Sequence, residues 1–275
     1  MSVLLGTLSA FFIGLGDLCV GRVLRAVHVV SLTTAASLGA LGSGAIGLLI
    51  VRSEFIAADF AMGVLSGCFM GVGLVFYFKG MQSASVGIVA PISAVQLALW
   101  PLGYDVIRGA RPSLLAWLGV VIAMVSLVLT TVSPELGNKV AAGVRSGVLA
   151  GSFYGIGIVV LSVTDPASGM WPAVAHRSSG VVVFAIAAVF LGLPSFPSPG
   201  QRWFSLLGGI LGGFGLVAYL YGAQNYSLGV VAVTSAMFPA FSSFLLYRFG
   251  DHPLRWWQGI GIAGAVSGVA LIALG

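Results

Sequence analysis

The chain has 275 residues, of which 59% are hydrophobic and 7% are charged, with a net charge of +5 and a mean hydropathy of +1.09. Soluble domains carry roughly a quarter of charged residues, so this composition excludes a soluble globular enzyme, a disordered chain and a nucleic-acid binder. The basic residues are scattered singly between apolar stretches, which is typical of the loops of a protein embedded in a bilayer.

Ten apolar segments are long enough to cross a bilayer as helices, each of which needs about 20 residues. Their apolar residues cover every face, whereas the strands of a membrane barrel would alternate apolar and polar positions. The predicted spans are 3–21, 29–51, 60–79, 86–107, 114–132, 144–163, 171–192, 203–222, 228–248 and 256–274. The first segment has no basic leader, so we expect it to be kept as a span rather than removed as a signal peptide.

The two halves of the chain repeat each other. Residues 71–90 (GVGLVFYFKGMQSASVGIVA) align without gaps on residues 213–232 (GFGLVAYLYGAQNYSLGVVA), 142 positions further on. Two shorter patterns recur in the same order, FxGxG at 12–16 and 153–157, and WxG at 117–119 and 257–259. The longest polar break begins at Ser133, which predicts two domains of five spans each, residues 1–133 and 143–275.

An odd number of spans in each repeat has a geometric consequence. The second half must enter the membrane from the side opposite to the first, so the two halves are inverted about a pseudo-two-fold axis in the membrane plane. The predicted fold class is therefore an all-α integral membrane protein with ten transmembrane helices in two inverted five-helix repeats. This arrangement is typical of secondary transporters, whose substrate site lies near the midplane between the repeats.

Four groups of motifs carry a family resemblance over nearly the whole chain. They are FIGLGD at 12–17, GLVFYFKGMQSASVGIVAPISAV at 73–95, GLVAYLYGAQNYSLGVVAVTSAMFPA at 215–240, and the GxxP turns at 109–112 and 250–253. With these motifs the chain resembles the EamA family of the drug/metabolite transporter superfamily. The resemblance implies two EamA-like five-helix repeats, no enzymatic activity, and export of amino acids or other metabolites.

The leading hypothesis is a secondary transporter in the inner or plasma membrane that exports a small amino-acid-like or other polar solute by alternating access. The expected partners are the solute, the lipid bilayer and, as a candidate coupling ion, the proton; no cofactor and no nucleic acid are expected. A carrier of lipid-linked, sugar or nucleotide-sugar substrates is the alternative within transport. A membrane enzyme is disfavoured because the chain has no HxxxH, DxxxD or GxSxG motif, and a non-transporting scaffold would not need an inverted repeat.

The distribution of basic residues and the resemblance disagree about orientation. Eight Lys and Arg residues fall in or beside the odd-numbered loops and four in or beside the even-numbered ones, which favours both termini outside. The resemblance implies both termini inside. We take the family orientation as the working expectation and leave the other open.

Asp17 and Lys79 are ionisable residues at the odd-loop ends of spans 3–21 and 60–79, and such residues inside a span are functional candidates. They could form a structural ion pair, or Lys79 could extend to the membrane interface. In the functional interpretation Asp17 is an exchangeable-proton site or a gate.

Arg177 begins a second polar group, toward the opposite side of the membrane. It could extend to the interface, or anchor a substrate carboxylate or phosphate through its planar guanidinium. The neighbouring His176 is expected as a hydrated histidine near the interface. In the repeat, Tyr77 and Gln82 are equivalent to Tyr219 and Gln224. We hypothesise that each tyrosine–glutamine pair forms a gate and that the two gates open alternately.

A third set of polar residues lies near the predicted midplane. Ser93, Gln96 and Trp100 follow i, i+3, i+7 spacing and therefore share one helix face. Ser235 occupies the position equivalent to Ser93, and Tyr154 lies at mid-depth in span 144–163. These residues predict a small pocket, with hydrogen-bonded helix packing as the alternative. Small-xxx-small patterns at 67–71, 151–155 and 208–212 predict close helix contacts.

Overall fold

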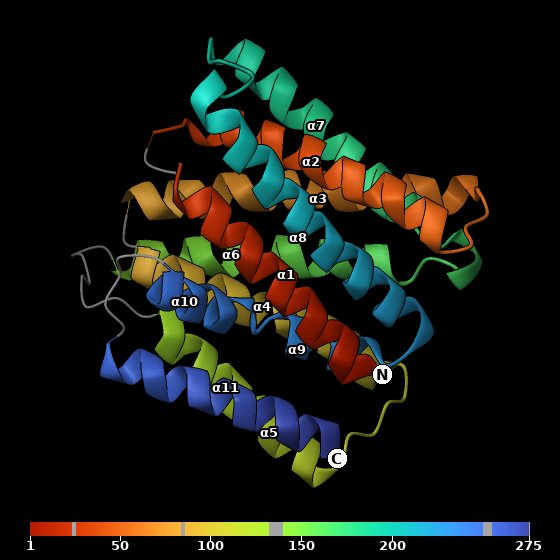
Figure 1. Cartoon of the computed structure of the whole chain (residues 1–275). Helices are drawn as coiled ribbons and strands as arrows, with labels where there is room; N and C mark the ends of the chain where they lie inside the picture. Colours follow the sequence, from red (N-terminus) through yellow and green to blue (C-terminus); the bar gives the residue numbers. More distant parts are fainter. Residues whose placement is uncertain (24–25, 84–85, 132–139, 250–254, 275) are drawn as a thin grey trace.

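The chain folds into a bundle of helices, shown by a computed structural model (Figure 1). The structure describes residues 1–23, 26–83, 86–131, 140–249 and 255–274, without the side chains of 78–83, 86–88, 90–91, 130–131, 140, 239, 243, 246 and 273. The helices are α1 (Ser2–Gly21), α2 (Val29–Ile50), α3 (Ala57–Ser83), α4 (Val86–Ile107), α5 (Leu114–Thr131), α6 (Val140–Ser162), the 3-10 turn η1 (Pro166–Ser168), α7 (Trp171–Phe190), α8 (Pro199–Asn225), α9 (Leu228–Ser235), α10 (Phe238–Phe249) and α11 (Trp256–Leu274).

The helices of the described ranges match the predicted spans in number and order, with one exception. Seven stretches are long and apolar enough to cross a membrane, and shorter apolar helices occupy 92–107, 114–129 and 256–272. The predicted span 228–248 is found as the apolar stretch Leu228–Phe249, but its helix turns at Ala236 and Met237 between α9 and α10. Pro239 has no N–H to donate to the carbonyl four residues back, so the helical ladder is interrupted there.

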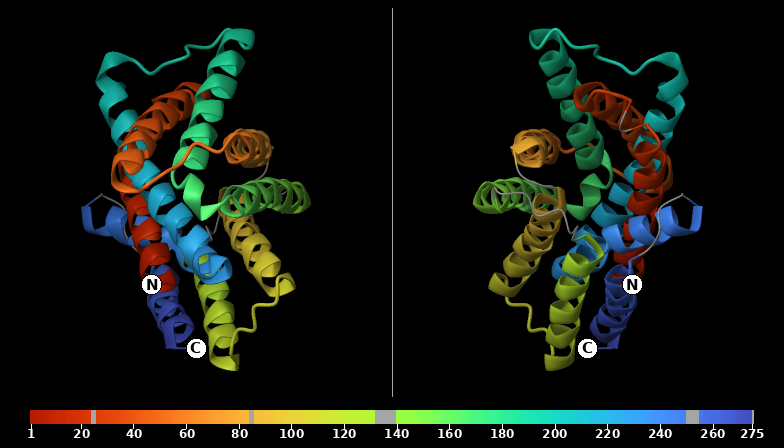
Figure 2. Two further views of the ribbon diagram at one scale, coloured as in Figure 1. Left: turned by 90° about the vertical axis from the view of Figure 1, so that its right-hand side faces the viewer. Right: turned by 90° about the vertical axis from the view of Figure 1, so that its left-hand side faces the viewer.

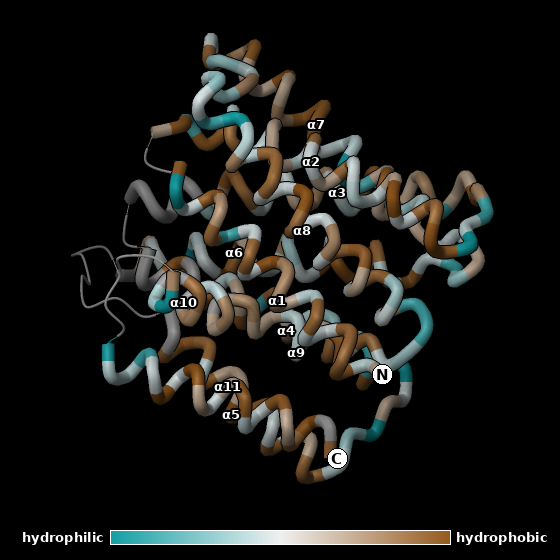
Figure 3. The backbone as a smooth tube through the Cα atoms, viewed as in Figure 1, coloured by the Kyte–Doolittle hydropathy of each residue, from teal (hydrophilic) through white to brown (hydrophobic). Residues whose placement is uncertain are grey.

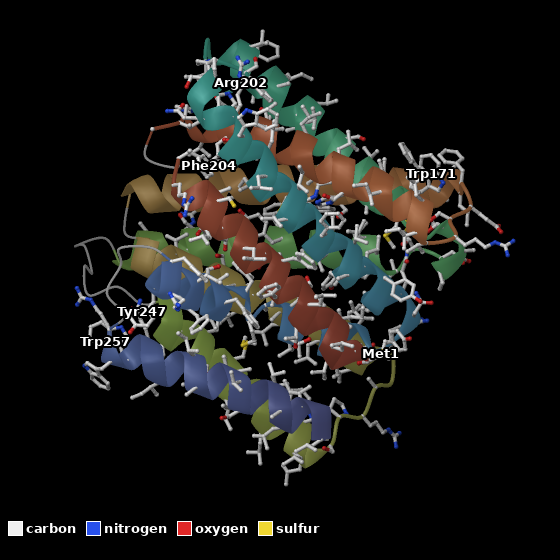
Figure 4. All side chains as sticks on the ribbon, in the orientation of Figure 1. Met1, Trp171, Arg202, Phe204, Tyr247 and Trp257 are labelled. Atoms are coloured by element: carbon white, nitrogen blue, oxygen red, sulfur yellow. The ribbon has the colours of Figure 1, made fainter. Side chains whose placement is uncertain are left out.

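The helix ends lie on two opposite sides of the bundle. We call the side where α1 begins and α11 ends the terminal face, and the opposite side the distal face (Figure 1). Met1 and Trp171 lie on the terminal face, and Arg202, Tyr247 and Trp257 on the distal face (Figure 4). Hydrophilic residues gather mainly at helix ends and loops, whereas the helix middles are largely hydrophobic (Figure 3).

The helices from the two halves of the chain interleave. α1 packs along α8, α3 along α6, α2 along α7, and α5 along α11, while α4 lies between α6 and α9 (Figure 2). Apolar clusters fill the bundle, one around Ala98, Leu127 and Met237 and another around Leu161 and Leu220. Each half therefore depends on the other for its buried surface.

Close contacts between helices rest on glycine. On α6, Gly147, Gly151 and Gly155 recur every four residues and face α4, where an added Cβ at Gly155 would come within 2.7 Å of Trp100. The packing predicted for the small-residue pattern at 151–155 is confirmed. It is also confirmed at Gly67 and Gly208, whereas an added Cβ at Gly212 would meet no atom within 4 Å. Gly212 instead borders a cavity.

Candidate functional site

Four helices, α1, α2, α7 and α8, line a partly open cavity of about 200 Å³. Its polar lining comes from Asp17 on α1, Thr33 and Ser37 on α2, and Arg177 on α7. The rest of the wall is small or aliphatic, namely Ile13, Gly16, Val20, Ala36, Ala40, Gly208, Gly209 and Gly212. This volume is below the roughly 300–1,000 Å³ common for drug-sized ligands, so the cavity fits a small solute.

The cavity brings together two charged residues that the sequence placed in separate groups. Asp17 was expected toward the odd loops and Arg177 toward the even loops, yet both line this one cavity. The Nε atom of Arg177 is buried and has no hydrogen-bond partner in the described part of the chain. Arg177 is half-buried as a whole, and a polar ligand group in the cavity would satisfy its Nε atom.

Asp17 and Arg177 do not pair with each other. Among the described residues, the only ion pair joins Arg52 and Glu54, at 3.8 Å on the exposed surface. One carboxylate oxygen of Asp17, Oδ2, instead accepts a hydrogen bond of 2.6 Å from the Ser242 hydroxyl on α10. The expected partner Lys79 has a side chain outside the described residues. The cavity thus holds two opposite charges with space between them.

His176 is a buried packing residue, and its expected place at a hydrated interface is wrong. Its exposed fraction is only 2%. The ring atom Nδ1 lies 2.9 Å from the hydroxyl of Ser66 on α3, which also donates to the carbonyl of Gly157 on α6 at 2.6 Å. His176 therefore joins α7 to α3 and α6, next to Arg177 but outside the cavity lining.

The tyrosines proposed as gates lie in two different settings. Tyr77 packs against Tyr154, with ring centroids 6.3 Å apart, and Tyr77 is close enough to Asp17 to interact electrostatically. Tyr219 is buried in the apolar core and accepts a hydrogen bond of 3.4 Å from Ser162. These two tyrosines stand on α3 and α8, which belong to different halves of the chain.

Of the two glutamines proposed beside the gates, only Gln224 has a side chain among the described residues. Gln224 donates to Thr164 at 2.8 Å, and its Oε1 is buried without a partner among the described residues. This contact lies at the terminal-face end of α8, which leaves a gating role there open. The side chain of Gln82 lies outside the described residues.

Gln96 and Trp100 border a separate groove between α4 and α6, together with Tyr104 and aliphatic residues. The groove has a volume of about 460 Å³, and Trp100 is 43% exposed on its wall. Ser93 is buried beneath Gly151 of α6. Ser235 forms a buried hydrogen bond of 2.8 Å with Ser9, which joins α9 to α1. The structure therefore places Gln96 and Trp100 together, and Ser235 apart from them in helix packing.

Thr33 and Ser37 line the cavity, although they were not among the site residues predicted from the sequence. Their i, i+4 spacing places both on one face of the helix, but α2 also carries Ser31, Thr34 and Ser43, so the sequence alone does not single out this pair. Within the described ranges, no three His, Cys, Asp or Glu side chains gather closely enough to hold a metal ion.

Comparisons with known proteins agree with this architecture. Residues 141–274 match the sequence profile of the EamA-like transporter family, which belongs to the drug/metabolite transporter superfamily. A crystal structure described only as that of a protein is similar to the chain with a TM-score of 0.81, covering 99% of this chain and 96% of its own, at 17% identity. At that identity the likeness shows the fold alone. No curated protein sequence matches the chain significantly.

Proposed function

Because the chain belongs, through residues 141–274, to the EamA-like transporter family of the drug/metabolite transporters, we propose that it is a secondary transporter of a small polar solute. The solute class that the geometry supports best is amino-acid-like, with one cationic and one anionic group. Export across the inner or plasma membrane is the direction proposed, in line with the family resemblance.

The observation that carries this proposal is the cavity shared by Asp17 and Arg177. A charge buried in a membrane protein is costly unless it is paired, and these two residues are not paired with each other. A zwitterion between them would place its ammonium group at Asp17 and its carboxylate at Arg177. The guanidinium can donate two parallel hydrogen bonds to a carboxylate, which an ammonium side chain cannot do.

Alternating access through two inverted repeats is supported by contacts that recur in both halves. Gly157 of α6 meets Ser66 and Met70 of α3 as Gly16 of α1 meets Gly208 and Gly212 of α8. Gly147 of α6 also meets Val89 and Ile92 of α4, as Gly6 of α1 meets Val231 and Thr234 of α9. The positions on α3, α4, α8 and α9 keep the shift of 142 residues found in the sequence. We propose that these equivalent contacts rock in turn to open the cavity to either face.

Coupling to protons is proposed through Asp17, the carboxylate of the cavity, with transport down the solute gradient as the competing mode. Tyr77 with Gln82, Lys79, and Tyr219 with Gln224 remain proposals for gating. The groove between α4 and α6 supports a second candidate function, the transport of lipid-linked or sugar-like substrates, because Gln96 and Trp100 could bind a larger amphipathic molecule there.

The test is flux in proteoliposomes that hold the purified protein. A panel of radiolabelled amino acids, sugars and nucleosides would be followed with and without a pH gradient, for the wild type and Asp17→Asn. Flux of zwitterionic amino acids, lost in the variant, is the expected result. Flux of sugars or nucleosides alone would contradict the proposed solute class, and flux that ignores the pH gradient would contradict proton coupling.

A further inference from the structure

Asp17 has contacts on two sides of α1. Toward α2, α7 and α8 it lines the cavity, and toward α10 its Oδ2 accepts the 2.6 Å hydrogen bond from Ser242. Ser242 does not line the cavity and is itself buried. The carboxylate therefore connects the proposed solute site to a helix that the solute would not touch.

The helix that carries Ser242 is separated from α9 by a turn. α10 is a 12-residue helix that follows the break at Ala236 and Met237. It lies along α1 and ends at the distal face, where Tyr247 and Phe249 are more than half exposed (Figures 1 and 4). Among the side chains of α10 that the structure describes, Ser242 alone hydrogen-bonds to another helix, so the bond to Asp17 is the polar link between α10 and the bundle.

The Ser242 hydroxyl has one proton and two acceptors within reach. Its Oγ lies 2.6 Å from Asp17 Oδ2 and 3.0 Å from the carbonyl oxygen of Phe238 in its own helix. Serine hydroxyls in helices commonly donate to such a preceding carbonyl. If Asp17 stops accepting, Ser242 keeps a partner in α10, so the link between the helices can break without leaving a buried donor unpaired.

The close approach of α1 and α10 depends on Gly14. A Cβ at this position would lie 2.8 Å from the Cβ of Phe241 and 3.0 Å from the backbone nitrogen of Ser242. These separations are shorter than normal van der Waals contact, so only glycine allows the carboxylate one turn away to reach Ser242 undisturbed.

We propose that Ser242 is a positioning residue that reports occupancy of the cavity to α10. In the empty site Ser242 holds Asp17 and keeps α10 against α1. A cationic group of the solute draws the Asp17 carboxylate toward the cavity, Ser242 turns to the Phe238 carbonyl, and α10 moves at the distal face. This inference rests on the proposed function, since it needs a solute that binds Asp17.

The test follows α10 with spin labels at Tyr247→Cys on α10 and Trp203→Cys on α8, both exposed positions, in a background lacking Cys19 and Cys68. The label distance is compared for the parent, Ser242→Ala and Ser242→Thr, each without solute and with a mixture of L-alanine, L-serine and L-threonine. We expect the empty Ser242→Ala protein to show the distance that the amino acids induce in the parent, and Ser242→Thr to behave as the parent does.

Transport kinetics provide the second readout. Ser242→Ala is expected to lower KM roughly threefold to tenfold, because Asp17 no longer has to leave a hydrogen bond to bind the solute, and to lower the maximal rate, because α10 no longer returns. A residue that only supported the fold would not lower KM. Ser242→Thr keeps the hydroxyl and should restore both parameters.

The outcomes separate this inference from the proposed function. If the empty Ser242→Ala protein keeps the label distance of the parent, the link to α10 is overturned, even where transport is normal. Amino-acid flux in the parent without any change in label distance also overturns it. If none of the amino acids is transported, the proposed solute class fails, and the coupling of solute to α10 fails with it.

Discussion

Asp17 and Arg177 are two ionisable residues of opposite charge that line the same cavity. They stand on α1 and α7, in different halves of the chain, and line one cavity of about 200 Å³. They form no ion pair with each other, and ionisable residues inside a membrane span are candidates for a functional role. A zwitterionic solute would satisfy both, which explains why opposite charges can face one cavity without forming an ion pair.

Arg177→Gln should abolish most transport. Truncating one partner of a buried charge pair costs about 2–5 kcal/mol, so kcat/KM for a transported amino acid should fall at least roughly 30-fold. Arg177→Lys keeps the positive charge but loses the planar guanidinium, so its kcat/KM should lie between those of the wild type and Arg177→Gln. Initial rates in proteoliposomes measure this, with Arg52→Gln as the control because that side chain is 94% exposed. Equal rates for Arg177→Gln and Arg52→Gln would refute the role of Arg177.

At the scale of elements, glycine and proline shape the bundle more than polar contacts do. The stripe Gly147, Gly151 and Gly155 sets the distance between α6 and α4, and the break before α10 divides the ninth span. At the terminal face, Asp105 at the end of α4 accepts hydrogen bonds from Ser227 and the backbone of Gly229, which join α4 to the start of α9.

Gly151→Ala should destabilise the fold. Its Cβ would lie 2.6 Å from the Cβ of Gln96 and closer still to the backbone carbonyl of Ser93, so α4 and α6 must move apart. Overpacking of this kind costs about 1–3 kcal/mol. Gly42→Ala, where a Cβ meets no atom within 4 Å, is the matched control and should be neutral or slightly stabilising. Thermal unfolding in detergent compares them, and equal midpoints would show that the stripe is not packed as described.

Much of the element order could be predicted from the sequence, because a bilayer requires long apolar helices and short loops. The sequence could not locate the break at Ala236 and Met237, since proline is tolerated in membrane helices and often only bends them. Helix ends also shifted; α8 extends to Asn225 where the span was predicted to end at 222. Composition assigns polar residues at the end of a span to the loop, although their backbones still form the hydrogen bonds of the helix.

At the scale of the whole molecule, interleaving of the two halves decides which side chains meet. From the sequence, the position of a residue across the membrane could be judged only from its place along its predicted span. On that basis Asp17 and Arg177 were assigned to opposite sides of the membrane. In the bundle, α1 packs on α8 and α2 on α7, which brings both residues to one cavity. Tertiary packing also separated Ser235 from Gln96, and it brought Thr33 and Ser37 into the cavity lining.

The bundle predicts that its two faces lie on opposite sides of the membrane. Single cysteines can be placed at Arg52, which lies beside Gly169 near Trp171 of the terminal face, and at Trp203, next to Arg202 of the distal face. In a background lacking Cys19 and Cys68, they should react with a membrane-impermeant maleimide from opposite sides of intact cells. The side on which Arg52→Cys reacts also decides between the orientation favoured by the basic residues and that of the family. Labelling of both cysteines from the same side would contradict the architecture.

The central claim is that solute passes through the cavity of α1, α2, α7 and α8, and Gly212→Leu tests it most directly. A side chain there meets no atom within 4 Å at its Cβ and would extend into the cavity. Gly103→Leu, which has the same clearance, would fill the groove between α4 and α6 instead. In proteoliposomes, Gly212→Leu should be folded but unable to transport amino acids, while Gly103→Leu retains flux. Normal flux in Gly212→Leu with loss in Gly103→Leu would move the transport site to the groove of Gln96 and Trp100.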